Sequence, residues 1–175
     1  MLGHEGRQVE PLDVVAVPVE RPVPLPYQPE NWLIADRPWR HLRTVGIGDS
    51  QDLLEQAEYN ESTLFGTPHD ALNSEGVPSD GISDSLALVR VERPILFRKS
   101  RWGRSPQIRA RFEFSHNRYD LAVTFEHELD EDEAGRQSAS NWWFTVSLGE
   151  EFEVGLDVLH YKLVAGALRI PADSP

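Results

Sequence analysis

The clearest pattern in the chain is strict alternation of apolar and polar residues in two neighbouring segments. Apolar residues occupy the even positions from 108 to 114 and the odd positions from 119 to 125. A period of two is typical of a strand that buries one face and exposes the other. The pattern therefore predicts two half-buried antiparallel strands joined by a tight turn.

Charge selects the register of this predicted hairpin. A two-residue turn at 115–116 places Arg111 opposite Asp120 and Glu113 opposite Arg118. A turn one residue later would place Glu113 opposite Asp120 instead. Opposite charges across a strand pair contribute roughly 0.2–1 kcal/mol, and like charges cost a similar amount. We therefore predict the first register.

The remaining hydrophobic pattern predicts a mainly β protein with one or two short helices and long loops. We expect strands at 12–19 (buried), 86–91, 95–97, 142–148 and 161–170, a helix at 50–59, a stiff proline-rich connector at 21–29, and a long loop at 66–84. Few short strands in the segment after residue 81 favour a small barrel over a sandwich. We place a boundary in the long loop, giving an N-terminal β/loop unit at 1–80 and a C-terminal β-barrel at 81–175.

Composition narrows the class of protein. The chain has 175 residues, no cysteine and a hydrophobic content of 39%, which together are typical of a globular protein without disulfides or thiolate metal sites. No apolar stretch is long enough to span a membrane. We expect a cytoplasmic location.

Charge is strongly segregated along the sequence. The stretch 90–118 holds nine of the seventeen basic residues and two acids, a net +7, so the rest of this −12 chain carries −19. A concentrated field of this kind indicates a surface that meets something anionic. Within it, we expect a loop that carries Arg98, Lys99, Arg101, Trp102 and Arg104.

This basic loop suits single-stranded nucleic acid, because guanidinium groups bind phosphate and an indole can stack a base. Arg109 and Arg111 extend the positive charge along one sheet face, although Asp120 faces Arg111 in the predicted register. In the competing interpretation, these arginines pair with the protein's own carboxylates. The acidic balance of the whole chain predicts binding that is weak and short-range.

Two further features carry alternative interpretations. Trp142 and Trp143 are adjacent in a predicted strand, so they leave opposite faces, and Trp143 either stacks a base or is covered by another part of the chain. The acidic run 126–133 is a solvated connector, a shield over the basic loop, or an oxygen-rich metal site. We favour the connector and expect no metal and no cofactor.

Catalytic signatures are missing from the sequence. The six histidines lack zinc-binding spacing, and neither a P-loop nor a nucleophile elbow is present. We expect no catalytic residues, although the sequence does not exclude an enzyme that uses the acidic run to hold a metal.

Three stretches resemble the dual OB-containing domain family: LDVVAVPVERPVPLPYQPENWLI at 12–34, RARFEFSHNRYDLAVT at 109–124, and VSLGEEFEVGLDVLHYKLVAGAL at 146–168. The resemblance implies two OB-like barrels that bind nucleic acid or a nucleotide-like ligand in prokaryotic defence or conflict systems. The family usually begins with a Cys-containing, Gly-rich segment that this chain lacks, so we expect the first barrel to be incomplete. At the family's turn, Pro29 to Trp32, we expect Asn31 to bond local backbone and Trp32 to fill the core.

These observations combine into one functional hypothesis and one alternative. The hypothesis is a non-catalytic OB-like module that binds single-stranded nucleic acid or a phosphorylated small ligand. Its expected binding residues are Arg98, Lys99, Arg101, Trp102, Arg104, Arg109, Arg111 and Trp143. The alternative is a protein-interaction subunit that docks an acidic partner through its basic face, or that self-associates through open sheet edges.

Overall fold

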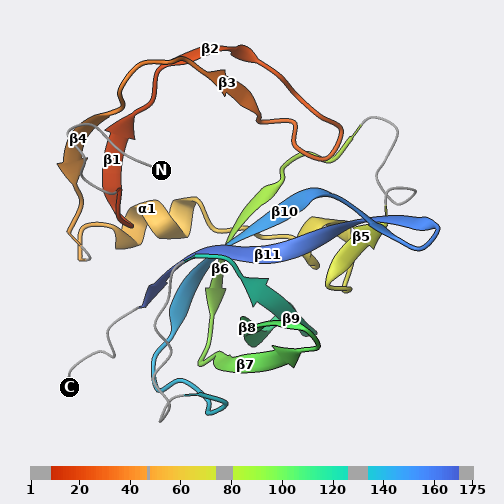
Figure 1. Cartoon of the computed structure of the whole chain (residues 1–175). Helices are drawn as coiled ribbons and strands as arrows, with labels where there is room; N and C mark the ends of the chain where they lie inside the picture. The colour runs from red at the N-terminus through yellow and green to blue at the C-terminus, as the bar shows by residue number, and fades with distance from the viewer. Residues whose placement is uncertain (1–8, 47, 74–80, 126–133, 170–175) are drawn as a thin grey trace.

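The fold is known from a computed structural model that describes residues 9–46, 48–73, 81–125 and 134–169, except for the side chain of Arg104 (Figure 1). It is mainly β, as predicted. The chain order is β1 (Asp13–Ala16), β2 (Val19–Pro22), β3 (Trp32–Ile34), β4 (Arg40–Thr44), α1 (Gln51–Gln56), the 3₁₀ turn η2 (Leu64–Gly66), β5 (Ala71–Asn73), β6 (Leu86–Val91), β7 (Ile95–Arg101), β8 (Arg104–Phe114), β9 (Asn117–Val123), β10 (Trp142–Val154) and β11 (Asp157–Arg169).

A seven-stranded sheet forms the body of the molecule. Its hydrogen-bonded order is β6, β10, β11, β9, β8, β7, and β5 pairs with β11 as well. The β11–β9 pair is parallel, and the other pairs of this sheet are antiparallel. Among the described strands no pairing joins β6 to β7, so the sheet remains open.

The β8–β9 hairpin confirms the predicted register. Arg111 lies opposite Asp120 and Glu113 opposite Arg118, across a two-residue turn. Ser115 and His116 in this turn have φ angles of 48° and 68°. Two consecutive positive φ angles match the right-handed twist of a two-residue hairpin. Alternation and cross-strand charge together are therefore sufficient to define this element.

The predicted basic loop between strands is wrong. The segment instead continues β7 to Arg101 and begins β8 at Arg104, so the turn is confined to Trp102 and Gly103. Gly103 has a φ of +63°, which suits glycine at a tight turn. The long strand extension arises because cross-strand pairing also satisfies the backbone of polar residues. We call residues 98–104 the basic hairpin tip.

Inward-facing residues of β6, β8, β9, β10 and β11 form the hydrophobic core. Val89, Phe112, Tyr119, Phe144 and Val164 are each at most 4% exposed. The turn η2 adds Leu64, whose backbone N–H donates to the Tyr119 hydroxyl at 3.0 Å. The predicted strands at 86–91, 142–148 and 161–170 thus provide much of this core, although β10 and β11 are longer than expected.

The first four strands form a separate curved ribbon, which we call the N-terminal ribbon. β1 pairs with β4, and β2 pairs with β3, so the two pairs follow one another along a single arch (Figure 1). The predicted buried strand at 12–19 is wrong, because it divides into β1 and β2 and none of its residues is fully buried. Trp32 is 52% exposed and does not fill the core as expected. Asn31 bonds the Gln28 side chain at 2.8 Å instead of backbone.

The ribbon's turn contacts the sheet at one end. The Tyr27 ring lies 4.3 Å from the His160 ring, and Gln28 donates to the Leu148 carbonyl at 3.3 Å. The backbone N–H of Ile82 donates to the Pro26 carbonyl at 3.0 Å. The contacts anchor the turn of the ribbon against β10, β11 and the segment before β6.

Two elements of the connecting region differ from the sequence prediction. The helix α1 is shorter than the expected 50–59, and the Ser50 side chain makes no cap hydrogen bond to it. The expected loop at 66–84 contains the short strand β5, which pairs with β11. The division into units at 1–80 and 81–175 stays a prediction.

Candidate nucleic-acid interface

The basic hairpin tip presents an aromatic side chain and flanking cations to solvent. Trp102 is 102% exposed, and Lys99 and Arg101 are also exposed. Among the described residues, neither of these two cations forms an ion pair. Arg98 is also exposed, but it already takes part in an interaction within the chain. Of the predicted binding residues, Arg104 has a side chain that lies outside the described part of the chain.

Strand alternation divides the basic residues between two faces. Leu96 and Arg98 lie opposite Ala110 and Ile108, on the face that leads to the core. Lys99 lies opposite Gln107, on the outer face. Neighbouring strand residues point to opposite sides of a sheet, so a cluster in the sequence is not a single cluster in space. The structure brings only the tip residues together at the end of the hairpin.

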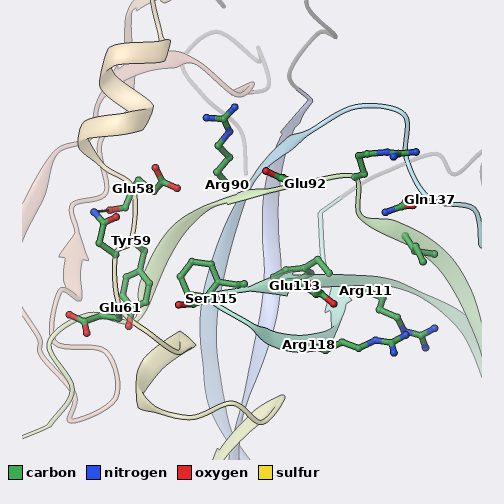
Figure 2. A pocket seen from close by; sticks show the side chains of 15 residues that line it. Glu58, Tyr59, Glu61, Arg90, Glu92, Arg111, Glu113, Ser115, Arg118 and Gln137 are labelled. Carbon is green, nitrogen blue, oxygen red and sulfur yellow. Dashed lines mark hydrogen bonds between the residues drawn. The ribbon is translucent and has the colours of Figure 1, made fainter.

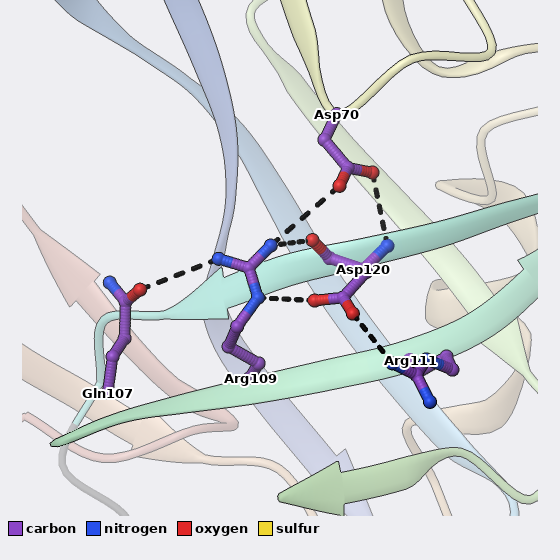
Figure 3. A network of polar contacts seen from close by, with 5 residues as sticks. All are labelled: Asp70, Gln107, Arg109, Arg111 and Asp120. Atoms are coloured by element: carbon purple, nitrogen blue, oxygen red, sulfur yellow. Dashed lines mark hydrogen bonds and ion pairs between the residues drawn. The ribbon is translucent and has the colours of Figure 1, made fainter. Parts of the chain in front are cut away.

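Arg109 and Arg111 are already held by carboxylates of the same chain (Figure 3). Arg109 Nε donates to the Asp120 carboxylate, and Arg111 Nη2 donates to the same carboxylate at 3.0 Å. Asp70 lies 3.7 Å from Arg109 Nη2 and also accepts from the Asp120 backbone N–H at 3.1 Å. The two arginines therefore form a structural network with their own aspartates, which supports the competing interpretation for them.

The electrostatics of this network favour its charged form. Partial burial raises the pKa of Asp120, but the hydrogen bonds and charges of Arg109 and Arg111 lower it by more than burial raises it. The pKa of Asp120 therefore lies below its ordinary value. Arg111 also lies 4.8 Å above the Phe97 ring. The sequence predicted that Asp120 pairs with Arg111, but not that it also pairs with Arg109. The second pairing was missed because Arg109 reaches Asp120 diagonally rather than directly across the strands.

Trp143 does not present a surface for base stacking. Its side chain is only 4% exposed, and that of Trp142 is 7% exposed. Stacking requires an accessible aromatic face. Of the two interpretations of Trp143, the structure supports the one in which this indole is covered.

A groove of about 740 Å³ lies beside the turn of the β8–β9 hairpin (Figure 2). Glu58 and Glu61 lie on one side of it, whereas Arg111 and Arg118 lie on the other. Its charged lining residues are Glu58, Glu61, Arg90, Glu92, Arg93, Arg111, Glu113 and Arg118. The equal numbers of both signs leave no surplus of positive charge for a polyanion.

Sequence reasoning did not select this groove. Arg90, Arg93 and Arg118 belong to the basic stretch, but their glutamate neighbours at 58 and 61 come from a distant segment. That segment is held by the backbone N–H of Tyr59, which donates to the Leu88 carbonyl at 2.7 Å. Such a long-range contact has no local signal in the sequence.

Two other predictions concern regions beyond the site. The acidic run 126–133 falls outside the described residues, so its three interpretations stay predictions. Within the described part of the chain, no helix has the length and apolar content needed to cross a membrane.

The mainly β fold agrees with a protein of the OB-containing class. A family model for the dual OB-containing domain matches residues 2–167, and the chain belongs to this family. Comparisons with curated proteins and with solved structures gave no match.

Proposed function

We propose that the chain is a non-catalytic nucleic-acid or nucleotide-binding module that uses the basic hairpin tip. The observation that carries this proposal is the fully exposed Trp102 beside the exposed Lys99 and Arg101. An indole without cover in water is available to stack a base, and stacking contributes about 1–3 kcal/mol per base. Lys99 and Arg101 lie at the end of β7, just before Trp102, and would bind the adjoining phosphates.

Single-stranded nucleic acid fits this tip better than a duplex. Stacking on Trp102 needs an unpaired base, and a two-residue turn is too small to read a groove by many contacts. The chain's net charge of −12 opposes long-range attraction of a polyanion. Attraction therefore acts only within about 8–10 Å of the tip near physiological salt. We expect weak binding that involves few phosphates and falls with added salt.

Titration of a labelled single-stranded oligonucleotide at two salt concentrations tests the proposal. Trp102→Ala should lower the affinity by about 5- to 150-fold, which corresponds to the loss of one stacked base. Lys99→Ala with Arg101→Ala should weaken binding and reduce the salt dependence, because each phosphate contact contributes a slope of about −0.7 on single strands.

Arg43→Ala is the matched control, since Arg43 is an exposed arginine on β4, away from the hairpin. It should leave the affinity unchanged. Absence of binding by the unmodified protein at low salt, or equal loss in the control, would count against the proposal. Competition by a nucleoside monophosphate separates a nucleotide ligand from a longer strand.

The proposal includes two finer points. A role in a prokaryotic defence or conflict system is what the resemblance to the family implies, and protection of host cells against phage by the unmodified gene, lost with Trp102→Ala, is the corresponding test. The second candidate function is docking of an acidic protein through the same exposed cations. It becomes the preferred function if the unmodified protein binds no oligonucleotide at low salt.

A further inference from the structure

A second hairpin projects from the sheet with the opposite charge. β10 and β11 continue beyond Leu148 to a turn at Gly155 and Leu156, and all residues from 150 to 157 are exposed. Figure 1 shows this end of the β10–β11 pair extending past β5 at the side of the sheet. The register shifts between Leu148 and Glu151, and a bulge of this kind bends a strand pair. We call residues 150–157 the acidic hairpin tip.

Apolar and acidic side chains occupy different positions on this tip. Phe152 is 55% exposed, Val154 is 42% exposed and Leu156 is 105% exposed. Phe152 also meets the Tyr161 ring edge-on at 5.9 Å, which extends the apolar strip along the strand. The acids of the tip are Glu150, Glu151, Glu153 and Asp157. Because neighbouring strand residues point to opposite faces, Phe152 and Val154 lie on one face of the projecting hairpin and Glu151 and Glu153 on the other, so the tip has an apolar face and an acidic face.

The basic hairpin tip has the complementary chemistry. It offers Trp102 as an apolar surface, with Lys99 and Arg101 as flanking cations. Trp102 and Leu156 are both completely exposed, so the two tips do not cover one another within a single molecule. A surface that joins apolar groups to one sign of charge favours a partner with apolar groups and the other sign.

We propose that the acidic hairpin tip of one copy docks on the basic hairpin tip of a second copy. Because the two tips are different surfaces, the contact is head to tail, and repetition leads to rings or short chains rather than a closed twofold dimer. Opposite charges at the tips attract only at short range, because the net charge of −12 repels two copies at a distance. Self-association is therefore weak and depends on concentration.

Reciprocal charge reversal tests this contact by sedimentation velocity over a range of protein concentrations. Glu151→Lys with Glu153→Lys, or Lys99→Glu with Arg101→Glu, should each lower the association constant at least about tenfold, because like charges then face one another. The four substitutions together restore opposite charges with the original net charge. This fourfold variant should associate within about threefold of the unmodified protein.

Two leucine variants test the apolar part of the contact. Leu156→Asp should reduce association, whereas Leu53→Asp, at an exposed leucine of α1, is the matched control and should not. All substituted side chains of the two tips are exposed, and circular dichroism checks that each variant keeps its fold. A protein that stays monomeric at all concentrations, or a fourfold variant that fails to recover association, would overturn the proposal.

The basic hairpin tip is shared with the proposed nucleic-acid function, so a single-stranded oligonucleotide should dissociate the oligomers. This competition rests on that proposed function, but self-association does not. The fourfold variant should associate and yet bind the oligonucleotide more weakly than the unmodified protein does. Association without oligonucleotide binding by the unmodified protein would remove only the proposed function, and binding by a strictly monomeric protein would remove only the self-association.

Discussion

The N-terminal ribbon and the seven-stranded sheet are both built mainly from antiparallel pairs, but they differ in burial. All residues of β2, β3 and β4 are exposed. Five of the seven residues from Trp142 to Leu148 in β10 are buried, because this segment has a strand on each side and a core beneath it. An isolated two-stranded pair is marginally stable in water. The comparison teaches that neighbours, rather than strand formation, decide how much an apolar residue stabilises the fold.

Polar side-chain contacts join β1 and β4 of the N-terminal ribbon. The Asp13 carboxylate accepts from the Thr44 hydroxyl at 2.5 Å and contacts His41 Nε2 at 3.1 Å. These bonds join β1 to β4 across the ribbon. Net stabilisation by one hydrogen bond is about 0.5–1.5 kcal/mol, so the ribbon has a smaller reserve than the packed sheet.

The largest expected difference follows from removing one aromatic side chain from each region. Phe144 is 1% exposed and contacts the Phe112 ring edge-on at 5.4 Å. Phe144→Ala should lower the free energy of unfolding by about 3–5 kcal/mol, since it leaves a cavity. Trp32→Ala, at a 52% exposed site in β3, should lower it by less than about 1 kcal/mol. Urea denaturation checks both values, and equal losses would break the comparison.

A second test removes one carboxylate from each region. Asp120→Ala leaves Arg109 and Arg111 without their shared partner in the sheet and should cost about 1–2 kcal/mol of global stability. Asp13→Ala should leave the denaturation midpoint almost unchanged and speed amide hydrogen exchange only in β1 and β4. Global destabilisation by Asp13→Ala would show that the ribbon unfolds together with the sheet.

The pH dependence of stability also contains the contribution of the Asp120 network. The pKa of Asp120 is lowered in the folded state, so its contribution is present above its ordinary value of 3.8 and is lost as the pH falls through the folded pKa. Unmodified protein should therefore lose more stability than Asp120→Ala between about pH 4 and pH 2. Parallel acid titrations followed by circular dichroism provide the measurement.

A buried amine gives the sheet a signature at alkaline pH. Lys162 is 1% exposed, and its Nζ donates to the Thr67 carbonyl at 2.5 Å and lies 5.1 Å from the Tyr119 ring. Burial lowers the Lys162 pKa from 10.5 to about 8, although the charge of Asp70 opposes this change. Between these values the unfolded chain binds more protons than the folded chain, so stability rises with pH.

Lys162→Met should remove that rise, which amounts to about 1–2 kcal/mol between pH 8 and pH 9.5. The measurement is urea denaturation of both proteins at the two pH values. The two pH values lie below 10 because burial also raises the pKa values of Tyr119 and Tyr59. Above pH 10 these tyrosines add their own contribution to the pH dependence of stability. An identical pH slope in both proteins would contradict the assignment to Lys162.

The smallest expected effect concerns the β8–β9 turn. His116 has a φ of 68°, a conformation that costs a residue with a side chain about 1 kcal/mol relative to glycine. His116→Gly should raise the free energy of unfolding by up to about 1 kcal/mol, less the greater entropy of glycine in the unfolded chain. Thermal denaturation measures the gain. A loss of stability would show that the His116 side chain has a contact that outweighs the backbone conformation.

Local patterns predicted the sheet better than they predicted the ribbon or the site. The strand at 86–91 and the β8–β9 register follow from alternation and charge, which act between residues close in sequence. The prediction that Trp32 fills the core was wrong, because its burial would require distant strands to cover it, and they do not. The ion pair between Asp70 and Arg109 could not be predicted either, since it joins residues far apart in the sequence.

The strand β11 has one further consequence. It follows all of its partners in the chain and pairs with β10, with β9 in parallel and with β5. During synthesis at a ribosome, those three strands emerge before the one that joins them. Long-range pairing of this kind also slows folding, because the loops must close first. The nascent protein therefore has open edges on β9 and β10 until β11 has left the exit tunnel, a period in which chaperone protection matters most.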